Sequence, residues 1–243
     1  MGVNIGELAM LWQILIYAGM FCIGVLAFSF VNDCIVRIPA GEKVFQGTCS
    51  LFMKHTSKRQ WVIEILGGVI MIVVLLQYQL SLAALTMYLL YAVLTVITCI
   101  DWDTQEIPPQ LNVAIFVLGV ISIFTIGQTG IVERIIGMLC ISVPLYLIIL
   151  VIPDGFGGGD IKMMFAAGFF LGWRATLVAF FIGLVLGGGY GVYLLAARKM
   201  GRKEHFAFGP FLAIGIAVSS YAGLGIYLMN LYLEPMKLLL NAS

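Results

Sequence analysis

Long apolar runs with few charges between them constrain this chain more than any other feature. Of its 243 residues, 62% are hydrophobic and only 10% are charged, whereas a soluble domain carries about 25% charged residues. A run of roughly 20 apolar residues crosses the hydrocarbon of a bilayer as an α-helix. The composition therefore predicts an all-α, polytopic membrane helix bundle.

Eight apolar segments can be counted, and together they predict one integral-membrane domain over residues 1–243. The sixth is only about 13 residues long, so we expect a short, immersed or re-entrant helix there. The first run follows no basic region and precedes no small-residue cleavage site, which favours a retained span over a signal peptide. The segments are approximately 9–31, 61–78, 81–100, 111–127, 131–152, 161–173, 176–197 and 208–232.

Basic residues predict the orientation of the spans. Nine of the thirteen lie in two loops, five in 37–59 and four in 198–203, and such loops face the cytoplasm. Eight spans with the N-terminus outside satisfy this bias. Asp101 then follows the third span and Asp160 the fifth, so both are expected at the cytoplasmic boundary. The net charge of +1 gives no indication of a nucleic-acid partner; the expected surrounding is the lipid bilayer, and nothing predicts an oligomeric state.

Two polar clusters stand beside the apolar segments, 101–109 and 155–162. A carboxylate at the lipid boundary is costly unless it is hydrated, paired or functional. If Asp101 and Asp160 came close they would share a proton, which supplies a base that activates water and an acid that protonates a leaving amine. The alternative is that the acids only cap helices.

The glycines before Asp160 indicate an unusual backbone. Gly157 and Gly159 could adopt left-handed conformations or admit another chain closely. A phosphate-binding loop is disfavoured, because GxxxxGK[ST] is absent and an Asp stands where GxGxxG needs its third Gly.

Together the two clusters resemble a known signature. The pattern Asp101-x-Asp103-x-x-x-Ile107-Pro108, followed by Gly157-x-Gly159-Asp160-x-Lys162, is similar to that of bacterial type IV prepilin peptidases, the GxGD-type intramembrane aspartyl proteases. Further stretches resemble that family along nearly the whole chain: Ser29-Phe30-Val31-Asn32, Arg37-Ile38-Pro39, Trp61-Val62-Ile63-Glu64 and Phe208-Gly209-Pro210-Phe211.

The resemblance implies roles for individual residues. Asp101 and Asp160 match the catalytic aspartates, and Asp103 is a second acid with a supporting role at most. Glu64 matches a residue associated with substrate or methyl-transfer functions. Lys162 flanks Asp160, where a cation could lower the pKa of the carboxylate or pair with lipid headgroups.

The resemblance also implies an activity, partners and a location. We expect a hydrolase that cleaves prepilin or pseudopilin-like precursors in the inner membrane of a bacterial cell, with its active site on the cytoplasmic side. The alternatives are a proton-coupled transporter, in which intramembrane acids relay ions, and a non-catalytic pilin-assembly factor.

The chain departs from the family pattern at two places, of which the second bears on cofactors. Pro109 follows Ile-Pro where the family usually has Asp. The loop 32–60 is short and has no CxxC pair, since its cysteines are Cys34 and Cys49, whereas many members carry two CxxC pairs there. We therefore expect no metal and no cofactor for cleavage. N-methylation with S-adenosylmethionine is in doubt.

One charged residue inside a span needs an explanation of its own. Arg134 stands beside Glu133 at the start of the fifth segment. We expect this pair to act as an interfacial anchor.

Overall fold

The computed structural model describes residues 5–42, 57–127, 129–151, 157–197 and 206–231, and every regular element in these ranges is helical. The predicted all-α class is thus confirmed. The chain forms two compact units, Met1–Ala92 and Val93–Ser243, with the division inside helix α3. The loop residues 43–56, which include Cys49, and the residues 152–156 and 198–205 lie outside the described ranges.

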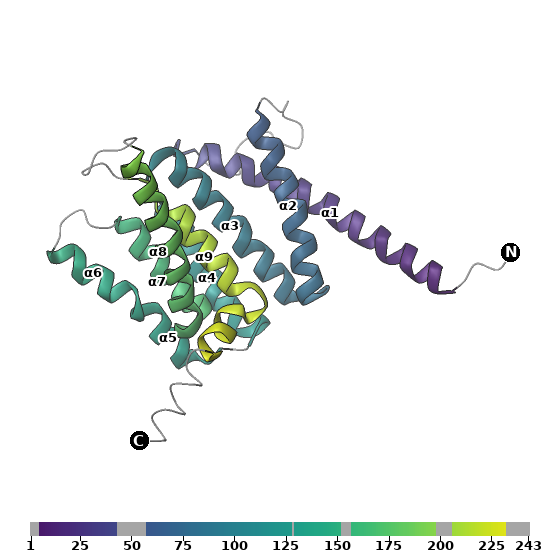
Figure 1. Cartoon of the computed structure of the whole chain (residues 1–243). Helices are drawn as coiled ribbons and strands as arrows, with labels where there is room; N and C mark the ends of the chain where they lie inside the picture. The colour runs from purple at the N-terminus through teal and green to yellow at the C-terminus, as the bar shows by residue number, and fades with distance from the viewer. Residues whose placement is uncertain (1–4, 43–56, 128, 152–156, 198–205, 232–243) are drawn as a thin grey trace, which may run out of the picture. The chain divides into compact units, whose positions relative to one another are not determined.

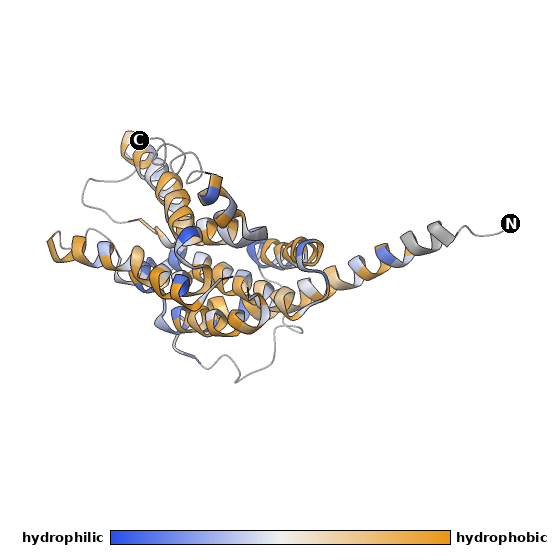
Figure 2. Ribbon diagram, turned by 90° about the horizontal axis from the view of Figure 1, so that it is seen from below, coloured by the Kyte–Doolittle hydropathy of each residue, from blue (hydrophilic) through white to orange (hydrophobic). Residues whose placement is uncertain are grey.

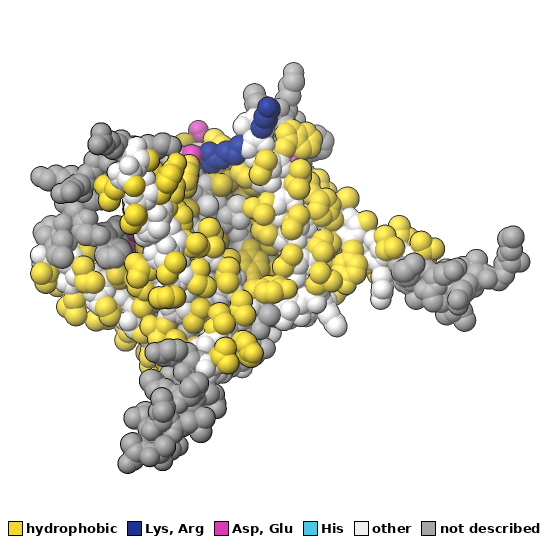
Figure 3. Space-filling view, in the orientation of Figure 1, with side chains coloured by type: hydrophobic (Ala, Val, Ile, Leu, Met, Phe, Trp, Pro, Cys, Tyr) yellow, Lys and Arg dark blue, Asp and Glu magenta, His cyan; other side chains and the backbone are white. Residues whose placement is uncertain are grey.

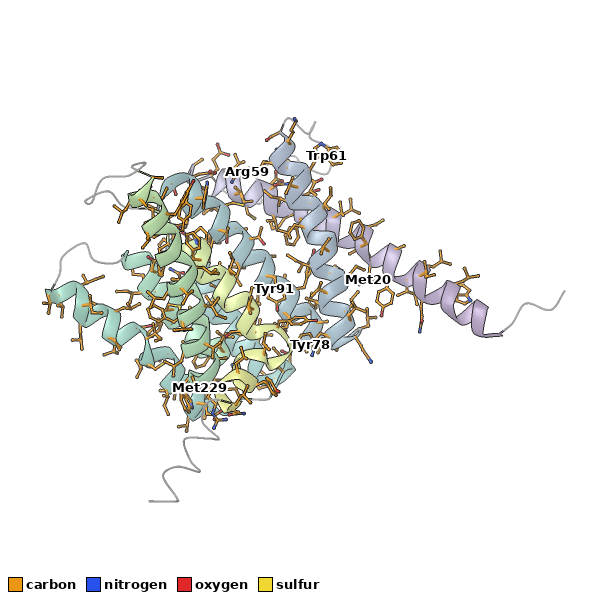
Figure 4. All side chains as sticks on the ribbon, viewed as in Figure 1. Met20, Arg59, Trp61, Tyr78, Tyr91 and Met229 are labelled. Carbon is orange, nitrogen blue, oxygen red and sulfur yellow. The ribbon has the colours of Figure 1, made fainter. Side chains whose placement is uncertain are left out.

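The first unit contains α1 (Ile5–Arg37), α2 (Lys58–Tyr78) and the first half of α3 (Leu82–Thr104). Helix α2 begins with a capping box in which Ser57 and Gln60 bond reciprocally to each other's backbone. A methyl group on Gly24 would lie 2.7 Å from the Gly67 carbonyl oxygen, so small residues allow α1 and α2 to approach closely. Trp61 and Tyr78 stand near opposite ends of α2 (Figure 4), as aromatic side chains do at membrane interfaces.

In its described residues, the second unit contains the rest of α3, an α-helix over Leu224–Leu231 and seven further helical elements. The elements are α4 (Pro109–Thr125), α5 (Ile131–Cys140), α6 (Ser142–Val151), α7 (Gly158–Leu171), α8 (Trp173–Ala196), α9 (Gly209–Ser220) and the short η2 (Tyr221–Gly223). Helix α7 lies at the centre of this unit, packed on α4, α5, α6, α8 and α9, while α8 and α9 run side by side (Figure 1). The core includes the fully buried side chains of Met163, Met164 and Ala167 on α7.

The outer surfaces of the helices are apolar. Phe124 is 85% exposed and Val151 is 80% exposed, and apolar residues dominate nearly every described helix (Figure 2). Hydrophobic side chains also cover most of the described face in Figure 3. Exposed apolar surface on this scale marks contact with lipid or a partner.

The predicted count of eight crossings is not confirmed. Among the described residues, five helical stretches are long and apolar enough to cross a membrane, or six if α9 and Leu224–Leu231, bent by 81°, form one span. Helix α7 has 14 residues, which is about 21 Å and shorter than the roughly 30 Å hydrocarbon core. The sixth segment is therefore short, as predicted.

The fifth predicted segment is broken between α5 and α6 at Ile141. Pro144 explains the break, because proline has no N–H and its ring clashes with the carbonyl four residues earlier, here Cys140.

The expected interfacial anchor at Arg134 was wrong. Its side chain is only 1% exposed. The guanidinium instead donates to the carbonyls of Thr129, Gly119, Phe169 and Phe170 and to the Ser122 hydroxyl, over 2.7–3.2 Å. Glu133 pairs with Arg174 on α8 at 3.7 Å.

Candidate active site

Asp101 lies in the last turn of α3 and is 4% exposed. Its Oδ2 accepts a hydrogen bond from the backbone N–H of Gly209 at 2.9 Å. Gly209 is the first residue of α9, and the next residue, Pro210, has no N–H of its own. The amide of Gly209 is thus one of the helix N-terminal donors that lack a partner within the helix, and Asp101 supplies that partner.

Asp160 lies in the first turn of α7 and is 7% exposed. Gly157 is the N-cap of this helix, and its carbonyl accepts from the Asp160 amide at 3.1 Å. The helix start therefore fixes the direction in which the carboxylate leaves the backbone.

The electrostatic state of Asp160 links it to Asp101. The pKa of the Asp160 carboxyl is raised to about 7, first by burial and then by the negative charge of Asp101, while a backbone hydrogen bond from Gly157 acts in the opposite direction. Asp160 lies outside the helices that are long and apolar enough to cross a membrane. Asp101 is therefore close enough for its negative charge to oppose ionisation of Asp160.

Ile107 contacts both halves of the site. A methyl group on Gly159 would lie 3.0 Å from the Ile107 Cβ, and one on Gly209 would lie 3.1 Å from its Cδ1. Gly159 precedes Asp160, and Gly209 binds Asp101. The two polar clusters predicted from the sequence thus meet around this side chain.

The glycines serve close approach rather than left-handed backbone. Gly157 has φ −69°, and Gly159 is within α7. A methyl on Gly157 would lie 2.9 Å from the Asp160 Oδ2. Of the two expectations for these positions, the close approach is the one that the geometry supports.

Asp103 and Lys162 occupy different surroundings from the buried pair. Both side chains are exposed. The supporting roles predicted for them stay predictions.

Glu64 belongs to a second polar cluster, inside the first unit. It is 3% exposed, and its Oε1 accepts from the Ser29 hydroxyl at 3.0 Å and from the Asn32 amide at 3.3 Å. The Asn32 amide also reaches the Gln60 carbonyl at 3.3 Å. A buried carboxylate among apolar helices needs such donors.

An aromatic cluster holds the start of α9 in place. Methyl groups on Gly187 and Gly191 of α8 would collide with or crowd the rings of Phe208 and Phe206 respectively. Tyr190 also packs on Phe206 and on Phe211, with ring centroids 6.0 and 5.3 Å apart. Gly187 and Gly191 therefore leave space on α8 for the rings of Phe206 and Phe208, which precede the Gly209 amide in the chain.

Sequence reasoning missed the hydrogen bond from Gly209 and the contacts of Ile107. Both residues stood inside stretches that resembled the family, which was the available signal. In the part of the chain that the structure describes, no three His, Cys, Asp or Glu side chains gather as metal ligands would.

Known proteins resemble the chain over most of its length. The sequence model of the type IV leader peptidase family matches residues 88–192. A prepilin leader peptidase/N-methyltransferase of Neisseria gonorrhoeae is 31% identical over 200 residues, which are 76% of this chain and 68% of the relative. One of the same name from Pseudomonas putida is 28% identical over 217 residues, 84% of this chain and 75% of the relative. No solved structure matches the chain.

Proposed function

Because the chain belongs to the type IV leader peptidase family, we propose that it is a membrane aspartic endopeptidase that removes the leader peptide of prepilin-like precursors. The observation that supports this most is the pair of buried carboxylates, Asp101 and Asp160, in which the charge of Asp101 raises the pKa of Asp160. Family membership also favours a peptidase over a proton-coupled transporter or a non-catalytic assembly factor.

The proposed reaction is a direct hydrolysis without a covalent intermediate. A water between Asp101 and Asp160 attacks the carbonyl carbon of the scissile bond. One carboxylate takes a proton from this water, and the carboxyl that already holds a proton gives it to the departing nitrogen. The raised pKa of Asp160 supports a pair that holds one proton near neutral pH.

Family membership and the apolar helices support a proposed substrate and a proposed location. The precursor presents a short basic leader followed by an apolar helix. Cleavage takes place at the cytoplasmic face of the inner membrane of a bacterial cell, where the basic loops meet anionic headgroups.

Cleavage by this pair needs no cofactor. The curated relatives also carry N-methyltransferase in their names. Methylation of the new N-terminus with S-adenosylmethionine is not part of the proposal, because the cysteines of the first loop, Cys34 and Cys49, form no CxxC pair. The short segment 32–60, of which residues 38–57 join α1 to α2, takes the place of a zinc-binding element.

Substitution of either acid by Asn tests the proposal. Asp101→Asn and Asp160→Asn remove a proton-transfer group, so each should lower kcat at least about 10²-fold. The measurement is the conversion of a labelled prepilin to its shortened product by the full chain in membranes.

Asp103→Asn is the matched control, since its side chain is exposed. It should retain most of the wild-type cleavage. Normal cleavage by Asp101→Asn or Asp160→Asn would rule out the pair, and an equal loss at Asp103 would show that the first acid is misassigned.

A further inference from the structure

We infer that Ile107 is a positioning residue whose side chain, held between Gly159 and Gly209, sets the separation of the Asp101 and Asp160 carboxylates. This inference rests on the proposed peptidase function. It concerns a residue with no ionisable group, which acts through the two acids.

The two ends of the Ile107 side chain meet different helices. Its Cβ and Cγ1 face Gly159, 3.0 and 3.4 Å from where a methyl on that glycine would be, and its Cδ1 faces Gly209 at 3.1 Å. Gly159 is in the first turn of α7, and Gly209 is the first residue of α9. The side chain thus separates the N-termini of these helices by its own length.

Each of those helix starts fixes one carboxylate. Gly159 is followed directly by Asp160, and the Gly209 amide donates to the Asp101 Oδ2 at 2.9 Å. A change in the spacing of Gly159 and Gly209 therefore changes the spacing of the two acids. Since the repulsion between like charges varies inversely with their distance, it also changes the ease with which both ionise.

The backbone around Ile107 makes it a stiff spacer. Gln105 has φ +56°, and its amide bonds the Asp101 carbonyl at 2.8 Å, so the chain turns sharply at the end of α3. Pro108 restricts the backbone of the residue before it to extended conformations, and the β-branched side chain of isoleucine has few χ1 rotamers. Ile107 is held in place by the end of the helix that carries Asp101.

A graded pair of substitutions tests the spacer. Ile107→Val removes Cδ1, the atom that faces Gly209. Ile107→Ala also removes Cγ1, one of the two atoms that face Gly159, and keeps only Cβ there. Displacements of about 1 Å can cost 10²-fold in rate, so kcat should fall between about tenfold and 10²-fold, more for Ala than for Val, with a smaller change in KM.

The pH profile separates positioning from mere loss of packing. With the spacer shortened, the helix starts move closer, a second ionisation becomes harder, and the alkaline limb of kcat/KM should move to higher pH. Ile115→Val is the control, because Ile115 is fully buried on α4 and loses the same methyl group; its alkaline limb should stay at the wild-type pH.

Prepilin cleavage by the purified full chain in lipid vesicles is the assay for every variant. An alkaline limb for Ile107→Val at or below the wild-type pH would overturn the inference, and so would an equal shift in Ile115→Val. The proposed peptidase function survives a failure of the Ile107 inference, provided that Asp101→Asn and Asp160→Asn are inactive in the same assay. If these two variants cleave normally, the proposed function itself fails.

Discussion

Three consecutive glycines precede Asp160, and their surroundings differ. A methyl on Gly157 would lie 2.9 Å from the Asp160 carboxylate, and one on Gly159 would lie 3.0 Å from the Cβ of Ile107. A methyl on Gly158 would meet nothing within 4 Å. The absence of a side chain at Gly157 and Gly159 therefore leaves room for the Asp160 carboxylate and for Ile107. At Gly158 no neighbouring group needs that room.

This difference predicts the outcome of an alanine series. Gly157→Ala and Gly159→Ala should lose about tenfold or more in kcat, because each forces a displacement at the carboxylate or at Ile107. Gly158→Ala should cleave prepilin as the wild type does, since alanine is favoured over glycine within a helix. Initial cleavage rates in membranes measure all three; equal losses would show that the space around the acid does not matter.

At the scale of single residues, the sequence predicts the two acids better than it predicts the groups that they contact. Asp101 and Asp160 stand out because ionisable residues are rare in apolar segments. The donor to Asp101 is a backbone amide, which every residue except proline has, so Gly209 had no distinguishing side chain. Ile107 was one apolar residue among many, and only the folded chain shows which of them touches two helix starts.

At the scale of single elements, α7 is held at both of its ends. Its first turn carries Asp160 and contacts Ile107. Its last turn offers the carbonyls of Phe169 and Phe170 to the buried guanidinium of Arg134. A positive charge at a helix C-terminus also interacts favourably with the helix dipole. The same guanidinium reaches Gly119 and Ser122 on α4, so it ties two helices together.

Loss of this tie should destabilise the protein. Arg134→Met keeps a long side chain but leaves buried carbonyls without their donor, which should cost about 1–3 kcal/mol. Thermal unfolding in detergent measures the effect.

Arg174→Met is the control for that measurement. Arg174 pairs with Glu133 at 3.7 Å, and both side chains are 37% exposed, so its removal should cost less than about 1 kcal/mol. A melting temperature for Arg134→Met that is no lower than that of Arg174→Met would contradict the role assigned to Arg134.

The positions of the helices could be predicted from the sequence, whereas the burial of the Arg134 side chain could not. Each of the eight predicted segments contains a helix, because apolar runs and flanking polar residues mark helices in a membrane well. The neighbouring charges of Glu133 and Arg134 suggested an interfacial anchor, whereas the guanidinium of Arg134 is buried and donates to the carbonyls of Gly119, Phe169 and Phe170, 15 to 36 residues away. Such partners have no periodicity in the sequence.

At the scale of the whole molecule, the described helices provide five or six candidate spans. Which loops face which side of the membrane stays a prediction from the distribution of basic residues. Residues 101–109 are predicted on the cytoplasmic side, and the turn between α2 and α3 is predicted on the opposite side.

Labelling of single cysteines tests this orientation. In a chain whose five native cysteines are replaced, Leu80→Cys should react with a membrane-impermeant maleimide added outside cells with a permeable outer membrane and an intact inner membrane. Glu106→Cys should react only after the inner membrane is opened. Leu80 is 80% exposed and Glu106 is also exposed, so both sites are accessible. The reverse pattern would invert the predicted topology.

The double attachment of α7 gives the molecule a remote point of control. Phe170 follows Asp160 by ten residues, which is about 15 Å along a helix. Because an α-helix of this length moves as a rod, a small molecule that competes with Arg134 for the last carbonyls would displace the acid at the far end. Such an inhibitor would never occupy the place of the prepilin, and a higher precursor concentration would not relieve its effect.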